Sequence, residues 1–382
     1  MGECMHVAID GKRFYLNASG LGRYSRTLIP ALLDEAPADA LTLTMFKPPG
    51  TVKFEEEPHP CLQIETASYR LPGNVGNALW RFRKLPRLIE SGPYSLFHGP
   101  SHVLPRKTRC PMVVTMFDLI FLRYPDYFPL WDRNYYRHMF KKSSQRADHI
   151  ISISQATKAD LVNYLDAPEE TISTVYPACD ADLTPQSAER LGDIHRRYDL
   201  PDDYVVYVGT IEPRKNILRT AQAFDRLLAD GRIDERVMFL IVGSQGWFYD
   251  EILSGIEELT FRKNIRLVGP VFGEDLAGMY QLATVMAFAS EFEGFGYPVL
   301  ESMQMGTAVL TSRISSLPEA GGDAAHYVDP LEVDDIATGL EKLINDPAYR
   351  QALVQKGFEH ARKFTAQKMA SKTLEIYKMI AR

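Results

Sequence analysis

The sequence is poor in cysteine, with four in 382 residues, and the four are widely separated at Cys4, Cys61, Cys110 and Cys179. This scatter contains no CxxC pair, which argues against a disulfide scaffold and against a zinc site. The sequence also lacks an apolar run of about 18 residues, the minimum for a transmembrane helix. Its start, MGECMHVAID, lacks the basic region and apolar core of a secretory leader. We therefore expect a protein of the reducing cytoplasm.

Excess basic charge is also missing, because the formal net charge is −6. The charge is uneven, with 21 basic and 19 acidic residues over 1–180 and 22 against 30 in the remainder. Two basic clusters, 80–88 (WRFRKLPRL) and 133–146 (RNYYRHMFKKSSQR), mix cations with aromatic residues. They indicate either peripheral contact with an anionic membrane face or acceptor, or two solvated helix faces with core aromatics. No nucleic-acid partner is expected.

What the sequence does have is a series of short, nearly continuous apolar runs, as expected for strands buried on both faces of a parallel sheet. Helical patterns lie between them, so we predict an α/β protein with two doubly wound, Rossmann-like domains facing a cleft. We expect the domains at 1–183 and 184–365, joined through the polar segment 178–203, and a C-terminal helix at 366–382 crossing back to the first domain. The runs lie at 6–10, 41–46, 62–67, 95–99, 112–118, 149–154, 171–177, 204–209, 237–243, 265–269, 285–290, 308–312 and 325–329.

The stretch ASEFEGFGYPVLES (289–302) predicts a sharp turn from a strand into a helix. Gly294 and Gly296, on either side of Phe295, allow positive φ and close approach to a ligand. Pro298 suits a helix start, and free N–H groups at a helix start favour a phosphate. We place Glu293 in the loop and Glu301 in the first helical turn, where both could accept hydrogen bonds from hydroxyls. This pattern favours a nucleotide-sugar site over a capping turn with two surface glutamates.

A second motif, VGTIEPRKN (208–216), follows the run YVVYV. Its cations, Arg214 and Lys215, stand at a predicted strand end just before a helix. Adjacent cations there can neutralise a diphosphate and stabilise it as a leaving group. A solvated turn is the alternative for this motif on its own.

Over nearly the whole length, the sequence resembles the retaining family 4 glycosyltransferases of GT-B fold. The second half carries VGTIEPRKN, IVGSQGWFYDEI, GPVFGEDLAGMY, EGFGYPVLESMQMG and SSLPEAGGDAAHYVDP. The first half carries GLGRYSRTL, FHGPSHVLP, FDLIFLRYP and ISISQATKADL. Together these are most similar to the bacterial mannosyltransferase-like group of O-antigen, capsule and exopolysaccharide assembly.

The resemblance implies roles for particular residues. Glu293 and Glu301 match the two acids of the family's E-x7-E motif, which contact the donor sugar and the ribose. Arg214 and Lys215 match the cations that bind the diphosphate. By the same match, Gly20 and Gly22 form the glycine loop after the first strand, which approaches the donor phosphates and the acceptor, and Val271 lies beside the base.

Two departures from the family pattern stand out. Thr210 follows the glycine of VGT, where many relatives have an arginine. Phe117 precedes Asp118, where relatives commonly have a histidine facing the donor sugar, and a phenylalanine cannot exchange a proton. Asp118 stays a catalytic candidate. His98 and His102, in FHGPSHVLP, are either partial substitutes for the missing histidine or structural residues.

The resemblance implies a retaining transfer of a hexose, mannose from GDP-mannose, to a saccharide or polyprenyl-linked acceptor, with no cofactor. The Asp180-Ala181-Asp182 sequence matches a metal-binding DxD only by spacing, so we expect no metal. The alternatives are a UDP- or dTDP-sugar donor and, because of Phe117, a degenerate nucleotide-sugar-binding scaffold.

Overall fold

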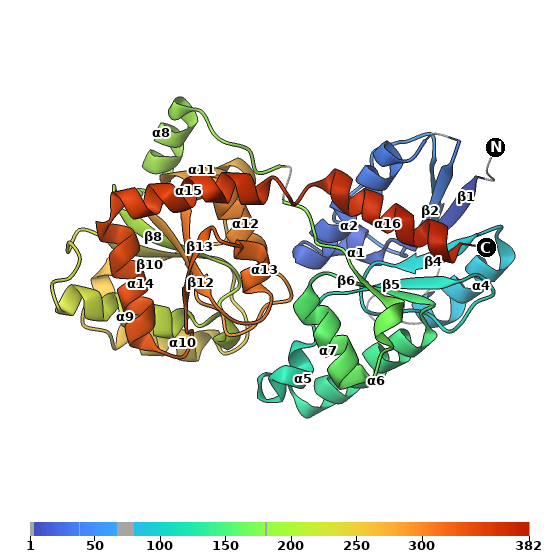
Figure 1. Cartoon of the computed structure of the whole chain (residues 1–382), viewed down its shortest axis with the longest axis horizontal. Coiled ribbons are helices and arrows are strands. Elements are labelled where there is room, and N and C mark those ends of the chain that lie inside the picture. The colour runs from blue at the N-terminus through green and yellow to red at the C-terminus, as the bar shows by residue number, and fades with distance from the viewer. Residues whose placement is uncertain (1–3, 38, 67–79, 180–181, 382) are drawn as a thin grey trace. The chain divides into compact units, whose positions relative to one another are not determined.

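The computed structural model describes residues 4–37, 39–66, 80–179 and 182–381. Its contacts divide the chain into two compact units (Figure 1). The first unit consists of Met1–Ala178 together with Phe364–Arg382, and the second unit is Cys179–Lys363. The chain thus leaves the first unit at 178/179 and returns at 363/364, beside the expected boundaries of 183/184 and 365/366.

The first unit is built on seven parallel strands, which are β1 (Met5–Asp10), β2 (Leu41–Lys47), β3 (Leu62–Thr66), β4 (Leu96–Gly99), β5 (Met112–Met116), β6 (His149–Ser152) and β7 (Ile172–Thr174). Their order is β3-β2-β1-β4-β5-β6-β7, and Ile9 of β1 lies opposite His98 of β4. Every residue of β4, β5 and β6 is buried, which explains why these runs are continuously apolar. The order reverses between β1 and β4, so the topological switch point lies there.

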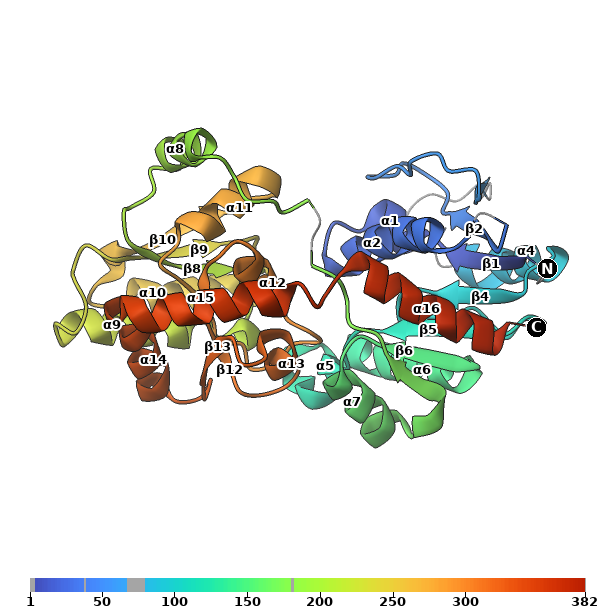
Figure 2. The same cartoon turned by 45° about the horizontal axis from the view of Figure 1, so that its top comes forward.

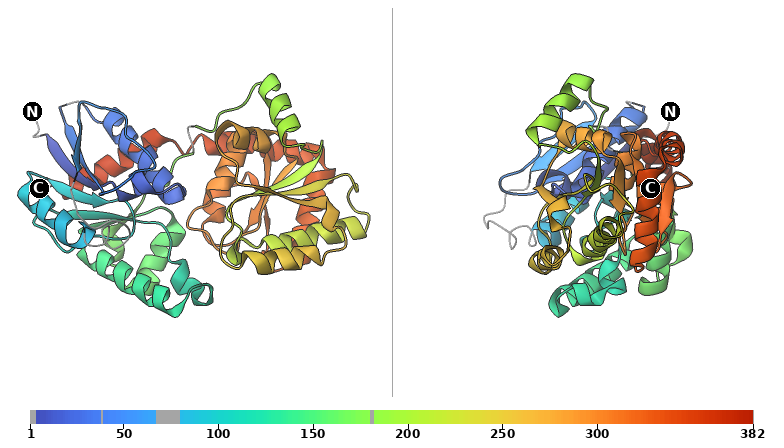
Figure 3. Two further views of the ribbon diagram at one scale, coloured as in Figure 1. Left: turned by 180° about the vertical axis from the view of Figure 1, so that it is seen from behind. Right: turned by 90° about the vertical axis from the view of Figure 1, so that its left-hand side faces the viewer.

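The second unit has six parallel strands, which are β8 (Tyr204–Val208), β9 (Met238–Val242), β10 (Ile265–Gly269), β11 (Val285–Phe288), β12 (Ala308–Ser312) and β13 (Ala325–Val328). Their order is β10-β9-β8-β11-β12-β13, with the switch point between β8 and β11. Each predicted run coincides with one of the observed strands, although β1 and β2 each extend one residue beyond their runs at 6–10 and 41–46. Helices cover both faces of each sheet (Figure 2, Figure 3). The prediction of two doubly wound parallel sheets is confirmed.

The helices of the first unit include short segments, such as α1 (Lys12–Leu16), and a longer helix after β5, α6 (Leu130–Arg146). They are α1 (Lys12–Leu16), α2 (Gly20–Glu35), η1 (Trp80–Lys84), α4 (Leu85–Ser91), α5 (Ile120–Arg123), η2 (Pro125–Tyr127), α6 (Leu130–Arg146), α7 (Gln155–Leu165), η3 (Glu169–Thr171) and α16 (Ala366–Ile380). Gly20 and Gly22, expected in a loop, lie in the first turn of α2.

The helices of the second unit precede, connect and follow its strands. They are α8 (Ala188–Arg197), η4 (Pro213–Lys215), α9 (Ile217–Ala229), α10 (Tyr249–Glu257), η5 (Arg262–Asn264), α11 (Gly273–Leu282), α12 (Tyr297–Gln304), α13 (Leu317–Gly321), α14 (Val333–Asn345) and α15 (Pro347–Ala361). The polar segment 178–203 contains α8, which is tied to α11 where Arg190 and Tyr198 donate to Asp275.

The last helix, α16, packs along α2 and belongs to the first unit (Figure 1). Its Tyr377 is fully buried, and the Tyr377 hydroxyl lies 2.6 Å from Nδ1 of His98. Ser371 Oγ also donates to Glu35 Oε1 of α2 at 2.6 Å. Residues from both ends of the described chain therefore complete one core. Within the described residues, no helix combines the length and apolarity that crossing a bilayer would need.

Candidate active site

The turn from β8 to α9 holds the first group of predicted site residues. Gly209 has φ +154°, and its N–H bonds the carbonyl of Val242 at the end of β9. Thr210 follows, and its carbonyl accepts a hydrogen bond from the Tyr207 hydroxyl at 3.0 Å. The chain then forms the short helix η4, which carries Arg214 and Lys215 at the carboxyl edge of β8, as predicted.

The turn from β11 to α12 holds the second group. Gly296 has φ +115°, and a Cβ there would lie 2.9 Å from Leu317 Cδ2, so this position requires glycine. Gly294, by contrast, is not among the glycines with positive φ, and Phe295 between them is buried. Helix α12 begins at Tyr297 with Pro298 in its first turn, as predicted. Glu301 is the fifth helical residue and so lies in the second turn, because the helix starts one residue before the proline.

The two turns meet in a buried ionic cluster. Lys215 Nζ donates to Glu293 Oε1 at 2.6 Å, and Arg214 Nη1 donates to Glu293 Oε2 at 2.9 Å. Arg214 Nη2 also pairs with Glu212 at 2.6 Å. Adjacent strands β8 and β11 bring these residues together across about 80 positions of sequence. The sequence predicted each residue, but it did not predict that both cations are already paired with carboxylates.

The ion pairs set the protonation of this cluster. Burial raises the pKa of the Glu293 carboxyl, but the charges of Arg214 and Lys215 outweigh burial and hold that pKa below its usual range. Burial and the neighbouring Arg214 lower the pKa of Lys215, while Glu293 opposes this change. Two cations and two carboxylates therefore face one another with no formal net charge. A diphosphate would be bound here by rearranging these pairs and by N–H groups at the start of α12.

The loop after β12 fixes the position of Glu293. Ser315, at φ +58°, and Ser316 both donate their hydroxyls to the Glu293 carbonyl, at 2.6 and 2.8 Å. Ser316 also donates to the carbonyl of Phe295 at 3.0 Å. The sequence alone predicted no role for this SSLPEAGG stretch. A non-glycine residue at positive φ beside a loop carboxylate is a strained position of the kind that gathers at functional sites.

Glu301 and Val271 complete the predicted donor residues of the second unit. Glu301 is 2% exposed, and its Oε2 accepts a hydrogen bond from the Tyr280 hydroxyl of α11 at 3.0 Å. Tyr280 was missed, because nothing in its own segment marks it as a partner of Glu301. Val271 is buried in the loop after β10, which is the carboxyl edge of that strand.

The remaining predicted residues lie in the first unit. A Cβ on Gly22 would lie 1.8 Å from the Asn17 carbonyl oxygen, and the Gly22 N–H donates to Asn17 Oδ1 at 3.1 Å. Gly20 begins the same helix. Gly22 allows α2 to start tightly against the end of α1, which is a structural reason for this glycine independent of ligand binding.

Phe117 and His102 share one buried aromatic cluster, and His98 is linked to it through Thr115, which bonds both His98 and Tyr24. The Phe117 ring packs edge-on against Tyr24 and His102, with centroids 4.9 and 5.3 Å apart. Burial lowers the pKa of both His98 and His102 to about 3, so both rings are neutral. His98 bonds Tyr377 and Thr115, and His102 stacks on Phe140. These contacts favour the structural interpretation of both histidines.

Asp118, the residue after Phe117, begins a turn at the carboxyl edge of β5 and is partly buried. Its Oδ1 accepts the N–H of Ile120 at 3.3 Å, at the start of α5. This hydrogen bond gives Asp118 a capping role in its own segment. Its role as a catalytic candidate stays a prediction.

The two basic clusters differ in exposure. In 80–88, Trp80 is fully buried and Arg81 is 6% exposed, so these two do not form a solvated face. On α6, by contrast, Trp131 is 88% and Tyr135 53% exposed. The cations of α6 that line a shared shallow depression are Arg137, Lys141 and Lys142. Helix α6 is therefore exposed at Trp131 and Tyr135, whereas Trp80 and Arg81 are buried. The Asp180-Ala181-Asp182 sequence lies partly outside the described residues.

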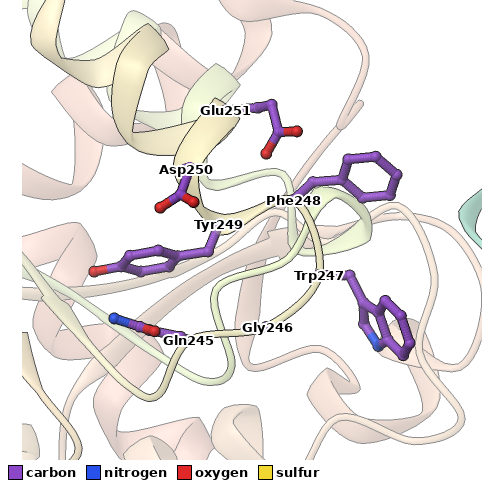
Figure 4. Close-up of a pocket in the computed structure, with 7 residues that line it drawn as sticks. All are labelled: Gln245, Gly246, Trp247, Phe248, Tyr249, Asp250 and Glu251. Atoms are coloured by element: carbon purple, nitrogen blue, oxygen red, sulfur yellow. The ribbon is translucent and has the colours of Figure 1, made fainter.

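A shallow pocket of about 340 Å³ adjoins the ionic cluster through the loop after β9 (Figure 4). It is lined by Gln245–Glu251, including the exposed aromatics Trp247 and Phe248. The loop is fastened to the β8 turn, since Gly246 N donates to the Ile211 carbonyl at 3.0 Å. IVGSQGWFYDEI resembles a family motif, but no site was predicted there, although two aromatic residues after a loop glycine are a usable signal.

Comparisons with known proteins identify the family of the chain. The model of Glycosyltransferase Family 4 matches residues 18–183, and that of Glycosyl transferases group 1 matches residues 194–360. O-antigen chain mannosyltransferase B of Escherichia coli is 30% identical over 95% of this chain and 96% of that protein. Serotype-specific mannosyltransferase WbdA of Escherichia coli is 31% identical over 70% of this chain, which spans 32% of that longer protein. The structure of Anabaena HepE in complex with UDP and glucose superposes with a TM-score of 0.72 at 15% identity, covering 98% of this chain and all of that one.

The two family models match residues in both units. The chain belongs to the glycosyltransferases of GT-B fold, with a family 4 domain followed by a group 1 domain.

Proposed function

We propose that this glycosyltransferase transfers a hexose, mannose from GDP-mannose, with retention of configuration and without a metal, to a saccharide on a lipid carrier. The observation that carries the proposal is the buried cluster of Glu293, Arg214 and Lys215 beside the start of α12. The full-length similarity to an O-antigen chain mannosyltransferase supports mannose as the sugar.

In the proposed reaction, Glu293 accepts hydrogen bonds from the donor sugar while Arg214 and Lys215 stabilise the departing diphosphate. Glu301, held by Tyr280, accepts from the ribose hydroxyls. No described residue is assigned as a base, because a donor phosphate oxygen takes the acceptor proton. The buried and neutral His98 and His102 fit this assignment.

The donor test is a thermal-shift panel of nucleoside diphosphates and sugar nucleotides, with and without EDTA, followed by transfer assays. Binding to the folded state raises the melting temperature by mass action. We expect a selective shift with GDP and GDP-mannose that EDTA does not change, and an α-linked product by NMR. A selective shift with UDP or dTDP sugars would replace the donor, and donor binding without transfer across a broad acceptor panel would favour a scaffold.

We also propose that α6 contacts an anionic membrane surface. The helix exposes Leu130, Trp131 and Tyr135 together with Arg137 and Lys141, and interfacial aromatics beside cations are typical of such contacts. Co-sedimentation with anionic vesicles should fall when Trp131→Ser is introduced.

The matched control for vesicle binding is Trp247→Ser. Trp247 is also an exposed tryptophan, 56% accessible, but it lies in the second unit far along the chain from α6. Equal vesicle binding by wild type and both variants would remove the membrane proposal and leave the transferase proposal untouched.

A further inference from the structure

A second charged cluster lies at the switch point of the first sheet and has too little negative charge. Lys12 and Arg13 follow β1 directly, in the first turn of α1. Arg81 comes from η1 and is 6% exposed. Asp10, the last residue of β1, is the carboxylate that opposes them, with Arg81 Nη2 2.5 Å from Asp10 Oδ2. Three cations therefore surround one carboxylate.

The electrostatic contacts show that these groups act on one another. Burial, together with the charges of Arg81 and Arg13, lowers the pKa of Lys12 to about 8, while Asp10 opposes this change. Burial and Arg81 likewise lower the pKa of Arg13. Arg13 and Arg81 also help to lower the pKa of His102, which follows β4. The cluster thus lies between the carboxyl ends of β1 and β4, the place in a doubly wound sheet where ligands bind.

Two buried donors in this cluster, Nε of Arg81 and Nε of Arg13, make no hydrogen bond within the described residues. Nη2 of Arg81 makes no aligned hydrogen bond either, but it lies against Asp10. The 2.5 Å approach of Arg81 to Asp10 is an ion pair without hydrogen-bond alignment. The second oxygen of Asp10 is already used, because Oδ1 accepts the Lys12 N–H at 2.9 Å. Leaving buried charged donors unpaired is costly, so their retention indicates a ligand that pairs with them.

We propose that Lys12, Arg13 and Arg81 bind a phosphate group of the acceptor. Three cations against one carboxylate leave a formal charge of +2, which a phosphate of about −1.5 to −2 would match and a carboxylate would not. Arginine side chains bind phosphate in a bidentate manner, and lysine acts as a point charge. The inference rests on the proposed function, because it names the acceptor chemistry of the same enzyme.

The phosphate could belong to a lipid carrier or to a phosphorylated sugar, and the probes separate these sources. Calorimetric titrations use inorganic pyrophosphate, geranyl diphosphate and glucose 6-phosphate. The protein is wild type, Arg13→Gln, Lys12→Gln or Arg81→Gln. Arg83→Gln is the matched control, because Arg83 lies on the same helix η1 but is exposed. Lys12 and Arg13 are half-buried, so their variants test the proposal even where Arg81→Gln does not fold.

We expect Arg13→Gln and Lys12→Gln each to weaken binding of the phosphate probes by about tenfold or more, the effect of losing one charge-assisted hydrogen bond. Arg83→Gln should bind as wild type. Tighter binding of geranyl diphosphate than of glucose 6-phosphate would assign the lipid carrier, and the reverse order would assign a phosphorylated sugar. Either order supports the site.

A second readout separates ligand binding from a structural role. Without ligand the cations repel one another, so Arg13→Gln should keep or raise the melting temperature while losing the shift that pyrophosphate produces. A lower melting temperature with an unchanged pyrophosphate shift would assign a structural role and overturn the proposal. An equal loss of GDP and geranyl diphosphate binding in Arg13→Gln would assign the cluster to the donor and also overturn it.

The proposed function and this inference fail in different measurements. Binding of sugar nucleotides by wild-type protein, without phosphate binding that depends on Arg13, would leave the transferase and remove the acceptor site. Phosphate binding that depends on Arg13, without binding of any sugar nucleotide, would do the reverse.

Discussion

Glu293→Gln is the sharpest test of the active-site cluster, because it removes one charge and almost no volume. Glu293 holds two cations, Lys215 Nζ at 2.6 Å and Arg214 Nη1 at 2.9 Å. Arg214 keeps Glu212 as a partner in the variant. Lys215, whose side chain is 10% exposed, loses its carboxylate. The exchange therefore leaves one buried ammonium group with a neutral amide as its partner.

Removing one partner of a buried ion pair destabilises a protein by about 3–5 kcal/mol. We expect the lower end for the second unit, because the glutamine oxygen can still accept from Lys215. For turnover, losing one charged hydrogen-bond partner of the transition state corresponds to about 2–4 kcal/mol, or roughly 30- to 1000-fold. The variant should thus remain folded at low temperature and lose most transfer activity.

A nucleoside diphosphate should reverse part of the stability loss. It brings negative charge to the cations that Glu293 no longer neutralises, so the difference in melting temperature from wild type should shrink at saturating diphosphate. The assay is thermal unfolding of wild type and variant with and without diphosphate, beside transfer kinetics.

The matched control is Glu291→Gln. Glu291 is two residues earlier in the same loop and pairs with Arg219 at 2.9 Å, so its removal tests the loop without touching Lys215. Near-wild-type turnover in Glu293→Gln, or an equal loss in Glu291→Gln, would refute the assignment of Glu293 to the donor sugar.

Three further predictions concern the first unit. Gly22→Ala should destabilise it by about 1–3 kcal/mol, since the new Cβ meets the Asn17 carbonyl, whereas Gly192→Ala in the open interior of α8 should be neutral or stabilising in denaturant titrations. Tyr377→Phe should cost about 1–3 kcal/mol by leaving His98 Nδ1 without its buried partner, with the exposed Tyr135→Phe as the control; equal unfolding midpoints would contradict this. His98 and His102, with pKa values lowered to about 3, take up protons on unfolding, so stability is retained above pH 6.5 and falls by about 1.4 kcal/mol per pH unit per histidine as pH drops toward 3. His138→Gln, at an exposed histidine, is the control. A constant free energy of unfolding from pH 6.5 to 4 in both wild type and this control would show that His98 and His102 are not buried in their neutral form.

The sheets were predictable from the sequence because their strands are buried on both faces. The apolar runs at 112–118 and 204–209, for example, contain β5 and β8 with every strand residue buried. Helix α15 was not predicted, because only four of its residues, Leu353, Gly357, His360 and Ala361, are buried and its apolar pattern is weak. The local pattern along a segment reports burial, so an element with little burial leaves little trace.

The candidate site was predictable residue by residue but not pair by pair. Glycine and proline marked the turn before α12, and PRK marked the end of β8. The pairing of Lys215 with Glu293 depends on β8 lying beside β11, which strand order decides and local sequence does not. Arg81 shows the same limit in the other direction, because its basic neighbours suggested a surface while Asp10 holds it inside.

The return of α16 to the first unit has a consequence for the order of events on the ribosome. Residues 364–382 emerge after the whole second unit, yet they cover α2 and supply the hydroxyl that bonds His98. The second unit is contiguous in the chain and can complete its core during synthesis, since domains generally fold as units. The first unit is translated first but completed last. Nascent chains that stall before residue 364 would therefore expose α2, which α16 does not yet cover, to chaperones.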